Sequence, residues 1–538
     1  MRLALTTVSQ KWWVARNEDG RAQPLRRWMT TVRLNCLLLF LVASVVSGCQ
    51  QFDKDLKEPS PTQLLIVVDG LRPDFVTADL TPQLHRLAQR GVIFKNHHAV
   101  FPTVTRVNAA SISTGAYPRT HGLMGNSVFM PKVDASSALS TGTKDVLDAI
   151  GHATDGQILT ATTLGEVLQG AGKSLVVLSS GTEGSGLLLN HTVAGGAVIH
   201  PGFTLPESLR ASLDATLGYS LPANASVAAQ TRWLVDVYLQ YVVEILQPDV
   251  TILWIGNLDG ASHAYGVGSP SALEALTTVD AEIARIETTL LTSERVSGVN
   301  LLVASDHGFS SHTGELDLDS LLEPHRGALE NGSPDVVRAG TAIYIRDSDL
   351  DKRDAIVNDL LTVAGHGAIF TPARGQDTVE GIVPGTFSQT LIGWNHARAA
   401  DILISPAWTS TINEYGYAGT TSQKGIAGHG SASPFDIHAV LIAAGPDFRE
   451  GLALDTPTAN VDLAPTLLYL LALGMPDSME GRVITEALRE GPTPSSVQAE
   501  TRHHSFELEL ASGPYAASAQ VSTLGEYMYL DHAEVQRP

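Results

Sequence analysis

The sequence contains very little cysteine. Its 538 residues include only Cys36 and Cys49, and both lie in the N-terminal stretch. If that stretch is removed on export, no disulfide bond can form within the mature chain. An exported protein of this kind depends on the size of its core and on bound metal for its stability.

Positive charge is scarce as well. The chain has 35 Lys and Arg residues against 56 Asp and Glu residues, a formal net charge of −21. Proteins that coat nucleic acids need stripes of Lys and Arg along the phosphates, so this composition argues against that class. A small phosphate substrate remains compatible with an acidic chain if metal ions dominate the local field. No repeat of 20–50 residues is present either, which argues against a solenoid.

The N-terminal stretch has the pattern of an export signal. Basic residues precede an apolar run at 34–46, which is too short to span a bilayer, and small residues follow it. The segment Val46-Ser47-Gly48-Cys49 resembles a bacterial lipobox, in which the Cys carries a lipid and becomes the first mature residue. An ordinary secretory signal is the alternative. Because residues 1–28 are unusual for a signal, Met29 is an alternative start to Met1.

The residue after the lipid site predicts where the mature chain is sorted. Gln50 occupies that position, whereas an Asp there would favour retention in the inner membrane. By resemblance to this rule, we expect a lipid-anchored protein of the bacterial cell envelope, on the outer membrane facing the periplasm. The anchor would be its only contact with the membrane, and the polar residues 50–61 would form a tether.

Apolar runs and amphipathic segments alternate through the rest of the chain. Strands that alternate with helices build a mostly parallel sheet covered on both faces. The sequence therefore predicts an α/β protein, a three-layer α/β/α sandwich. We expect strands at 64–68, 92–100, 174–178, 250–255, 300–304 and 438–444, and helices at 81–90, 162–170, 228–246, 272–291 and 461–473.

The main domain is expected to span residues 62–495. Within it, residues 310–427 hold mixed strand-like pieces between two candidate metal motifs. We interpret this stretch as a cap-like insertion beside the site. The tail, residues 496–538, is expected to add a few strands.

Carboxylates follow three of the predicted strands. Asp69 follows the first, Asp259 follows the strand at 250–255, and Asp306 follows the strand at 300–304. Open α/β sheets place their ligands at the carboxyl ends of strands, so we expect these side chains to meet there. For Asp69 alone, a turn formed with the next glycine is the alternative.

Histidines accompany two of these carboxylates. Asp259 and His263 are four residues apart, and on a helical turn they can share one ion. Asp306 and His307 are adjacent, so both can bind metal only if the backbone turns, and Gly308 permits such a turn. A divergent pair is also suited to flanking two neighbouring ions.

A third histidine, His429, lies between two glycines that leave room for an ion or a substrate. An exposed polar residue is the alternative for such a histidine taken alone. Three carboxylates and three histidines without cysteine match zinc better than magnesium, because imidazole favours Zn²⁺.

Thr105 follows an apolar strand and precedes a predicted helix at 106–114. The unpaired N–H groups of a helix N-terminus stabilise phosphate oxygens. A metal-bound alkoxide would make Thr105 a nucleophile, because the ion lowers the pKa of the hydroxyl. The alternative is that Thr105 is only the N-cap of that helix.

Together these motifs resemble the type I phosphodiesterase/nucleotide pyrophosphatase family of the alkaline phosphatase superfamily. The resemblance covers residues 62–475. It rests on Phe101-Pro102-Thr103-x-Thr105, the block from Ser113 to Asn126, Asp259-x₃-His263, Ser305-Asp306-His307-Gly308, Gly428-His429-Gly430 and the segment from Asn460 to Thr466.

The resemblance implies an alkaline-phosphatase-like fold and a phosphoric ester hydrolase with two Zn²⁺ ions, other divalent metals being the alternative. Thr105 would attack phosphorus and form a covalent phospho-threonine, and Asn126 would hydrogen-bond a non-bridging phosphoryl oxygen. The implied substrate is a small phosphate ester or nucleotide, hydrolysed in two in-line displacements. The implied ligands are Asp69, Thr105, Asp306 and His307 for one ion, and Asp259, His263 and His429 for the other.

One position departs from the family's pattern. The better-known nucleotide members carry an aromatic residue after the nucleophile, where substrate bases pack, and here the residue is Arg106. A guanidinium can grip a phosphate through two hydrogen bonds, which favours a doubly charged substrate. Alternatively, Arg106 points into the protein and pairs with an Asp.

Other functions remain open on the same site. A phosphomonoesterase or a phosphonate hydrolase is the alternative within the enzyme class, and a sulfatase is disfavoured because residue 105 is neither Cys nor Ser. A catalytically silent, lipid-anchored binding protein is the alternative of another class. The presence of all seven predicted ligands argues against it.

Overall fold

The structure is a computed structural model that describes residues 61–292, 298–346, 349–376 and 379–537. The predicted signal, residues 1–49, lies outside the described residues, as does the predicted tether except for Pro61. None of the helices in the described ranges combines the length and the apolarity that a membrane crossing requires.

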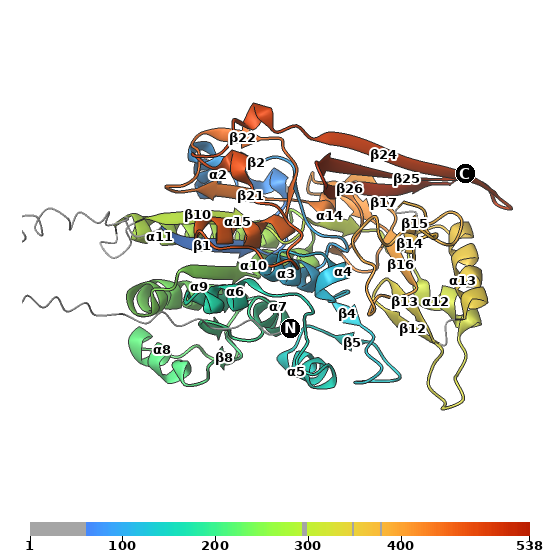
Figure 1. Cartoon of the computed structure of the whole chain (residues 1–538), viewed down its shortest axis with the longest axis horizontal. Helices are drawn as coiled ribbons and strands as arrows, with labels where there is room; N and C mark the ends of the chain where they lie inside the picture. Colours follow the sequence, from blue (N-terminus) through green and yellow to red (C-terminus); the bar gives the residue numbers. More distant parts are fainter. Residues whose placement is uncertain (1–60, 293–297, 347–348, 377–378, 538) are drawn as a thin grey trace, which may run out of the picture. The chain divides into compact units, whose positions relative to one another are not determined.

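A nine-stranded sheet runs through the described part of the chain in the order β22-β2-β21-β10-β1-β9-β6-β7-β8 (Figure 1). Its neighbouring strands are parallel, except that β21 and β8 run against their neighbours. The predicted, mostly parallel sheet is confirmed. Its strands are β1 (Thr62–Val68), β2 (Val92–Phe94), β6 (Leu175–Ser179), β7 (Ala197–Ile199), β8 (Thr204–Leu205), β9 (Val250–Ile255), β10 (Val299–Ala304), β21 (Leu441–Ala444) and β22 (Leu452–Leu454).

Successive residues of β1 belong to two different hydrophobic cores, one on each face of the sheet. Leu65 and Val67 pack in a core with α3, α5, α6, α7 and α15. Leu64, Ile66 and Val68 pack in a core with α2 and α8–α11. A strand buried on both faces reads as a continuous apolar run, and the predicted three-layer sandwich is confirmed. The helices are α2 (Pro82–Arg90), α3 (Thr105–Thr114), α5 (Lys144–Ala153), α6 (Leu164–Gly170), α7 (Glu183–Leu188), α8 (Leu209–Leu217), α9 (Val227–Val237), α10 (Asn257–Tyr265), α11 (Pro270–Thr292) and α15 (Leu463–Leu470).

Three predicted elements are interrupted, and those predictions were wrong in extent. The strand predicted at 92–100 is β2 followed by β3 (His97–His98), which joins a separate sheet with β20 (His438–Ala439) and β23 (Thr458–Ala459). The strand predicted at 438–444 is likewise divided into β20 and β21. The helix predicted at 228–246 is α9 followed by a π-helical segment at Tyr238–Leu246. Apolarity marks these residues as buried, but it does not record where the chain changes sheet.

The stretch predicted as a cap-like insertion, residues 310–427, builds most of two further sheets. Their orders are β17-β18-β11-β19 and β12-β13-β16-β14-β15. The elements are β11 (Ser310–His312), α12 (Leu318–Leu322), β12 (Val336–Ala339), β13 (Ala342–Ile345), α13 (Leu350–Thr362), β14 (His366–Thr371), β15 (Phe387–Ser388), β16 (Ile402–Pro406), β17 (Trp408–Ile412), β18 (Ala418–Thr421) and β19 (Ala427–Gly428).

Short elements and a C-terminal sheet complete the fold. The tail predicted to add strands contains the antiparallel strands β24, β25 and β26, drawn in dark red in Figure 1. Strand β26 contacts α14, β14 and β3. The remaining elements are α4 (Pro118–His121), β4 (Ser127–Val128), β5 (Leu139–Ser140), α14 (Pro434–Ile437), β24 (Glu500–Leu510), β25 (Gly513–Leu524) and β26 (Tyr527–Gln536).

Candidate active site and metal centre

Three neighbouring strands deliver the three predicted carboxylates to one edge of the sheet. Strand β1 lies between β10 and β9, and Val67 pairs in register with Ala304 and Trp254. Asp69 follows β1, Asp306 follows β10, and Asp259 lies in the first turn of α10 just after β9. Because the three strands are parallel, their carboxyl ends meet at the same edge.

Asp69, Asp306 and His307 form a buried group, which we call the Asp306 group. Nε2 of His307 lies 3.1 Å from Oδ2 of Asp306 and 3.5 Å from Oδ1 of Asp69. The hydroxyl Oγ1 of Thr105 lies 3.3 Å from the same Nε2. The predicted nucleophile therefore contacts this group directly.

Asp259, His263 and His429 form a second group, the Asp259 group, which is partly open to solvent. Oδ1 of Asp259 lies 3.2 Å from Nε2 of His263 and 3.4 Å from Nε2 of His429. The two Nε2 atoms are 3.3 Å apart. The rings of His307 and His429 stack with centroids 3.5 Å apart, so the two groups adjoin.

All three histidines have the same tautomer, which is fixed by the backbone. Nδ1 of His307 donates to the carbonyl oxygen of Gly308 at 2.9 Å, Nδ1 of His263 to that of Ala427 at 2.9 Å, and Nδ1 of His429 to that of Thr103 at 2.8 Å. A carbonyl oxygen only accepts, so in the neutral ring each Nε2 carries a lone pair. Metal-binding histidines are oriented in this way.

The carboxylates lack donors on the side that faces the histidines. Oδ1 of Asp69, Oδ1 of Asp259 and Oδ2 of Asp306 are buried and accept no hydrogen bond within the described part of the chain. Burial, followed by repulsion between the carboxylates, raises the pKa of Asp69, and burial raises the pKa of Asp306. Burial and the adjacent His307 lower the pKa of His429 to about 4. Buried acceptors that converge without donors are costly unless a cation lies among them.

The spacing of these acceptors suits a tetrahedral zinc ion. With Zn–N and Zn–O bonds of about 2.0–2.2 Å, tetrahedral ligand atoms lie about 3.3 Å apart. The contacts within the two groups fall between 3.1 and 3.5 Å. The residues present therefore fit a divalent metal at each group, with nitrogen and oxygen ligands as zinc prefers over magnesium.

Thr105 is the first residue of α3, and the N-cap is Val104, whose side chain makes no capping bond. The alternative that Thr105 is only an N-cap is therefore wrong. Its buried hydroxyl contacts the Asp306 group instead.

Asn126 and Arg106 lie next to the nucleophile. Oδ1 of Asn126 accepts from the backbone N–H of Arg106 at 2.9 Å. The Nδ2 amide of Asn126 has no hydrogen-bond partner in the described ranges. The guanidinium of Arg106 reaches the carbonyl of Asn126 at 3.4 Å, and no carboxylate pairs with it among the residues described. Burial lowers the pKa of Arg106, and Asp69, Asp259 and Asp306 act against that shift. The alternative of a paired, inward-pointing Arg106 thus lacks its Asp partner.

Gly308 is needed for a different reason from the predicted one. Its φ angle is not in the left-handed region. A Cβ atom there would instead lie 2.0 Å from the carbonyl oxygen of Phe435 in α14. The N–H of Gly308 donates to the carbonyl of Asp436 at 2.8 Å, so close backbone contact with α14 holds the segment after Asp306 and His307.

Sequence reasoning missed three residues that support the ligands. Nε1 of Trp254 donates to Oδ2 of Asp69 at 3.0 Å. The ring of Phe309 packs against those of His263 and His429, with centroids 4.9 and 5.4 Å away. Buried Asp436 accepts from the hydroxyl of Ser431 at 2.6 Å, which fixes the loop of His429. Of these three, only Trp254 could have been inferred from the sequence, because it lies in a strand predicted to be buried and a buried indole N–H needs an acceptor.

Comparisons with known proteins identify the family to which the chain is similar. The sequence profile described as type I phosphodiesterase/nucleotide pyrophosphatase matches residues 63–431. Human ectonucleotide pyrophosphatase/phosphodiesterase family member 1 is 24% identical over 438 residues, which cover 77% of this chain and 40% of the relative. The chain therefore matches less than half the length of that relative.

Solved structures with low sequence identity share the fold. Murine ectonucleotide pyrophosphatase/phosphodiesterase 5 superimposes with a TM-score of 0.54 at 20% identity, over 79% of this chain and 100% of that chain. Alkaline phosphatase PafA superimposes with a TM-score of 0.60 at 16% identity, over 80% of this chain and 99% of that chain.

Proposed function

Because the chain belongs to the type I phosphodiesterase/nucleotide pyrophosphatase family, we propose that it is an exported hydrolase of phosphate esters with Thr105 as its nucleophile. The observation that carries this proposal is the contact of Oγ1 of Thr105 with Nε2 of His307, at 3.3 Å, beside three carboxylates that each have one buried oxygen without a donor in the described residues. The proposed location, a lipid anchor in the cell envelope, is supported only by the N-terminal sequence.

Two divalent ions, zinc in our proposal, would lower the pKa of the Thr105 hydroxyl and neutralise charge on the phosphoryl group and the leaving oxygen. Asp69, Asp306 and His307 would hold one ion, and Asp259, His263 and His429 would hold the other. The Nδ1-to-carbonyl bonds of the three histidines would leave their Nε2 lone pairs available to the ions.

The chain's own groups then orient the substrate. Oγ1 of Thr105 forms a bond to phosphorus as the bond to the ester oxygen breaks, which leaves a phospho-threonine. Attack of water on that phosphorus releases phosphate or a phosphomonoester and restores the hydroxyl. The N–H groups of the first turn of α3 and the unpartnered Nδ2 of Asn126 are the donors available to non-bridging oxygens.

The nucleophile is tested with Thr105→Ala and, as a matched control, Thr105→Ser. We expect Thr105→Ala to lower kcat on bis-p-nitrophenyl phosphate by at least about a thousandfold with bound zinc retained, because no covalent intermediate can form. Thr105→Ser keeps a hydroxyl and should retain measurable turnover. Full activity in Thr105→Ala, or wild-type activity that survives chelation, would contradict the proposal.

A phosphomonoesterase is the second candidate, and Arg106 favours it. Arg106 follows the nucleophile in the chain, and its guanidinium reaches the carbonyl of Asn126 with no paired carboxylate in the described ranges, so it is available to a second negative charge on the substrate. The ratio of wild-type rates on p-nitrophenyl phosphate and bis-p-nitrophenyl phosphate decides between the two candidates. Absence of turnover on both, with metal bound, would favour the binding-protein alternative.

A further inference from the structure

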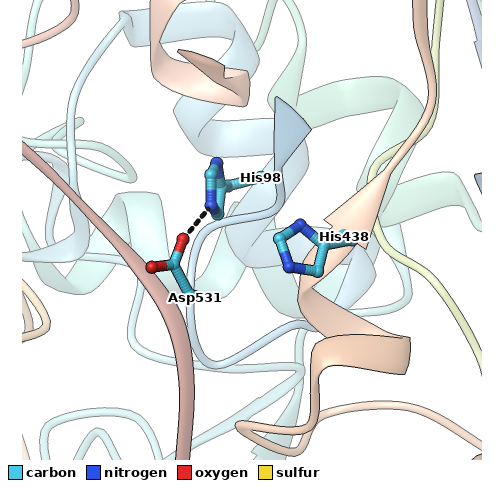
Figure 2. A group of neighbouring side chains, drawn as sticks. All are labelled: His98, His438 and Asp531. Atoms are coloured by element: carbon cyan, nitrogen blue, oxygen red, sulfur yellow. Dashed lines mark hydrogen bonds and ion pairs between the residues drawn. The ribbon is translucent and has the colours of Figure 1, made fainter. Parts of the chain in front are cut away.

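A third cluster of metal-binding residues lies outside the active site. His98 on β3 and His438 on β20 are directly paired across two antiparallel strands. Asp531, on the C-terminal strand β26, lies against His98, and Figure 2 shows the three side chains together. One ligand atom from each residue lies within 4.8 Å of the others.

The contacts of His98 require either a second proton on its ring or a bound cation. Its Nδ1 contacts the carbonyl oxygen of Thr458 at 2.9 Å, and since a carbonyl only accepts, Nδ1 carries the proton. Its Nε2 lies 2.8 Å from Oδ1 of Asp531. Two acceptors at that distance repel each other unless the ring takes up a second proton or a cation binds between them. The three active-site histidines have the same Nδ1-to-carbonyl contact.

The other two members of the cluster are arranged as ligands. Asp531 is buried, and its carboxylate accepts from Nε2 of Gln520 at 3.1 Å and from Oγ of Ser522 at 2.9 Å. Such outer contacts orient a metal-binding carboxylate. Nδ1 of His438 is buried and has no hydrogen-bond partner in the described part of the chain. That nitrogen is therefore open to a metal ion.

We propose that His98, His438 and Asp531 bind a divalent transition-metal ion, with Zn²⁺ as the best match to two imidazoles and one carboxylate. The site is separate from the proposed active site and does not rest on it. His438 is the partly exposed member of the cluster and also lines a surface cleft of about 330 Å³ with Arg72 and Phe435.

The ligands come from three distant parts of the chain, so a bound ion would act as a cross-link. It would tie the C-terminal sheet to β3, which leads to Thr105, and to β20, which follows α14. A chain without disulfide bonds in its described part gains most from such a closure of long loops.

Metal content of the purified, zinc-loaded chain tests the proposal. We expect three zinc equivalents in the wild type and two in His438→Gln, with activity on bis-p-nitrophenyl phosphate unchanged within about twofold. Asp531→Asn should lose the same equivalent, because a neutral amide is a poor zinc ligand. His503→Gln, at an exposed histidine on β24, is the matched control and should retain all three.

A separate variant keeps the test decisive if these substitutions prevent folding. Asp259→Asn combined with Asp306→Asn removes a carboxylate from each active-site group and leaves the third cluster intact. We expect this variant to retain one equivalent of zinc, or of Co²⁺ with its visible absorption. No bound metal in this variant, or equal metal content in folded His438→Gln and wild type, would overturn the proposal whatever the catalytic activity.

Discussion

At the scale of single residues, the hydrogen bond made by one ring nitrogen of a histidine decides what the other ring nitrogen can bind. His263, His307 and His429 each use Nδ1 to bond a backbone carbonyl, and this frees Nε2 for a metal ion. The same logic identifies His98. A hydrogen bond that contacts neither metal nor substrate therefore sets the chemistry of each ring.

Arg106 should determine preference between substrate classes. We expect Arg106→Ala to lower kcat/KM for p-nitrophenyl phosphate by about 10- to 100-fold more than for bis-p-nitrophenyl phosphate, because a charge-assisted contact to the second negative charge is lost. Arg106→Lys keeps the charge without the paired donors, so its loss in kcat/KM should lie between those of the wild type and Arg106→Ala. An equal loss on both substrates would show that Arg106 does not sense that charge.

His121 should make the fold sensitive to acid. It is fully buried, accepts from the N–H of Leu123 at Nδ1 and contacts Oγ of Ser111 at Nε2, both at 3.1 Å. Burial, assisted by the nearby His396, lowers the pKa of His121 to about 3. Between about pH 3 and 6.5 the unfolded chain therefore binds more protons than the folded one.

The contribution of His121 is fully present above about pH 6.5 and is lost as the pH falls toward 3. At pH 5 the loss is on the order of 2 kcal/mol. Urea denaturation of wild type and His121→Gln between pH 4 and 7 measures it, and we expect a shallower pH dependence in the variant. The exposed His152 provides the control, His152→Gln, which should leave the slope unchanged.

At the scale of elements, the site depends on how closely α14 approaches the end of β10. Gly308 and Phe309 both donate their N–H groups to carbonyls of α14, at 2.8 and 2.9 Å. The side chain of Asp436 in α14 accepts from the hydroxyl of Ser431, in the loop of His429. One short helix thus connects the Asp306 group to a ligand of the Asp259 group.

Gly308→Ala tests this connection. The added methyl would meet the carbonyl of Phe435, so either α14 or the segment of Asp306 and His307 must move. We expect zinc content and activity to fall together, with a loss in unfolding free energy of about 1–3 kcal/mol. Gly170→Ala, at the end of α6 with open space around it, should leave zinc content and activity unchanged and should not lower the unfolding free energy. Full zinc content in folded Gly308→Ala would contradict the role given to this contact.

At the scale of the whole molecule, the metal ions that we propose would contribute cross-links of the kind that disulfide bonds supply in many exported proteins. One oxygen of each of the three carboxylates at the sheet edge is buried and accepts no hydrogen bond within the described residues, and burial raises the pKa of Asp69 and Asp306. We expect zinc to raise the Tm of the chelated chain, because each site adds about 2.7 kcal/mol to the free energy of unfolding at a free zinc concentration of 100 Kd. Differential scanning calorimetry against zinc concentration measures this.

The zinc-dependent rise in Tm should depend on the Asp306 group, the Asp259 group and the third cluster. In a His438→Gln background, Asp259→Asn with Asp306→Asn should abolish most of the zinc-dependent rise in Tm. A rise that persists in this triple variant would place the stabilising ions elsewhere on the acidic surface.

By itself, the sequence determined which residue types stand at the ends of which strands. Continuous apolar runs marked β1, β9 and β10 correctly, because burial on both faces removes the polar alternation. Asp69, Asp259, Asp306 and Thr105 were therefore located by local patterns, and the predicted sandwich followed from the alternation of strands and helices. The division of the ligands between two ions came from family resemblance. In the structure, the predicted carboxylate and histidine ligands form two groups with that division, and Thr105 contacts His307.

Only the tertiary structure decided what depends on contacts between distant segments. The break between β2 and β3, the approach of α14 to Gly308 and the meeting of His98, His438 and Asp531 leave no local mark in the sequence. Apolarity specifies that a residue is buried, but not against which partner, because the partner is chosen by the order of strands in the sheets. That order is a property of the folded chain as a whole.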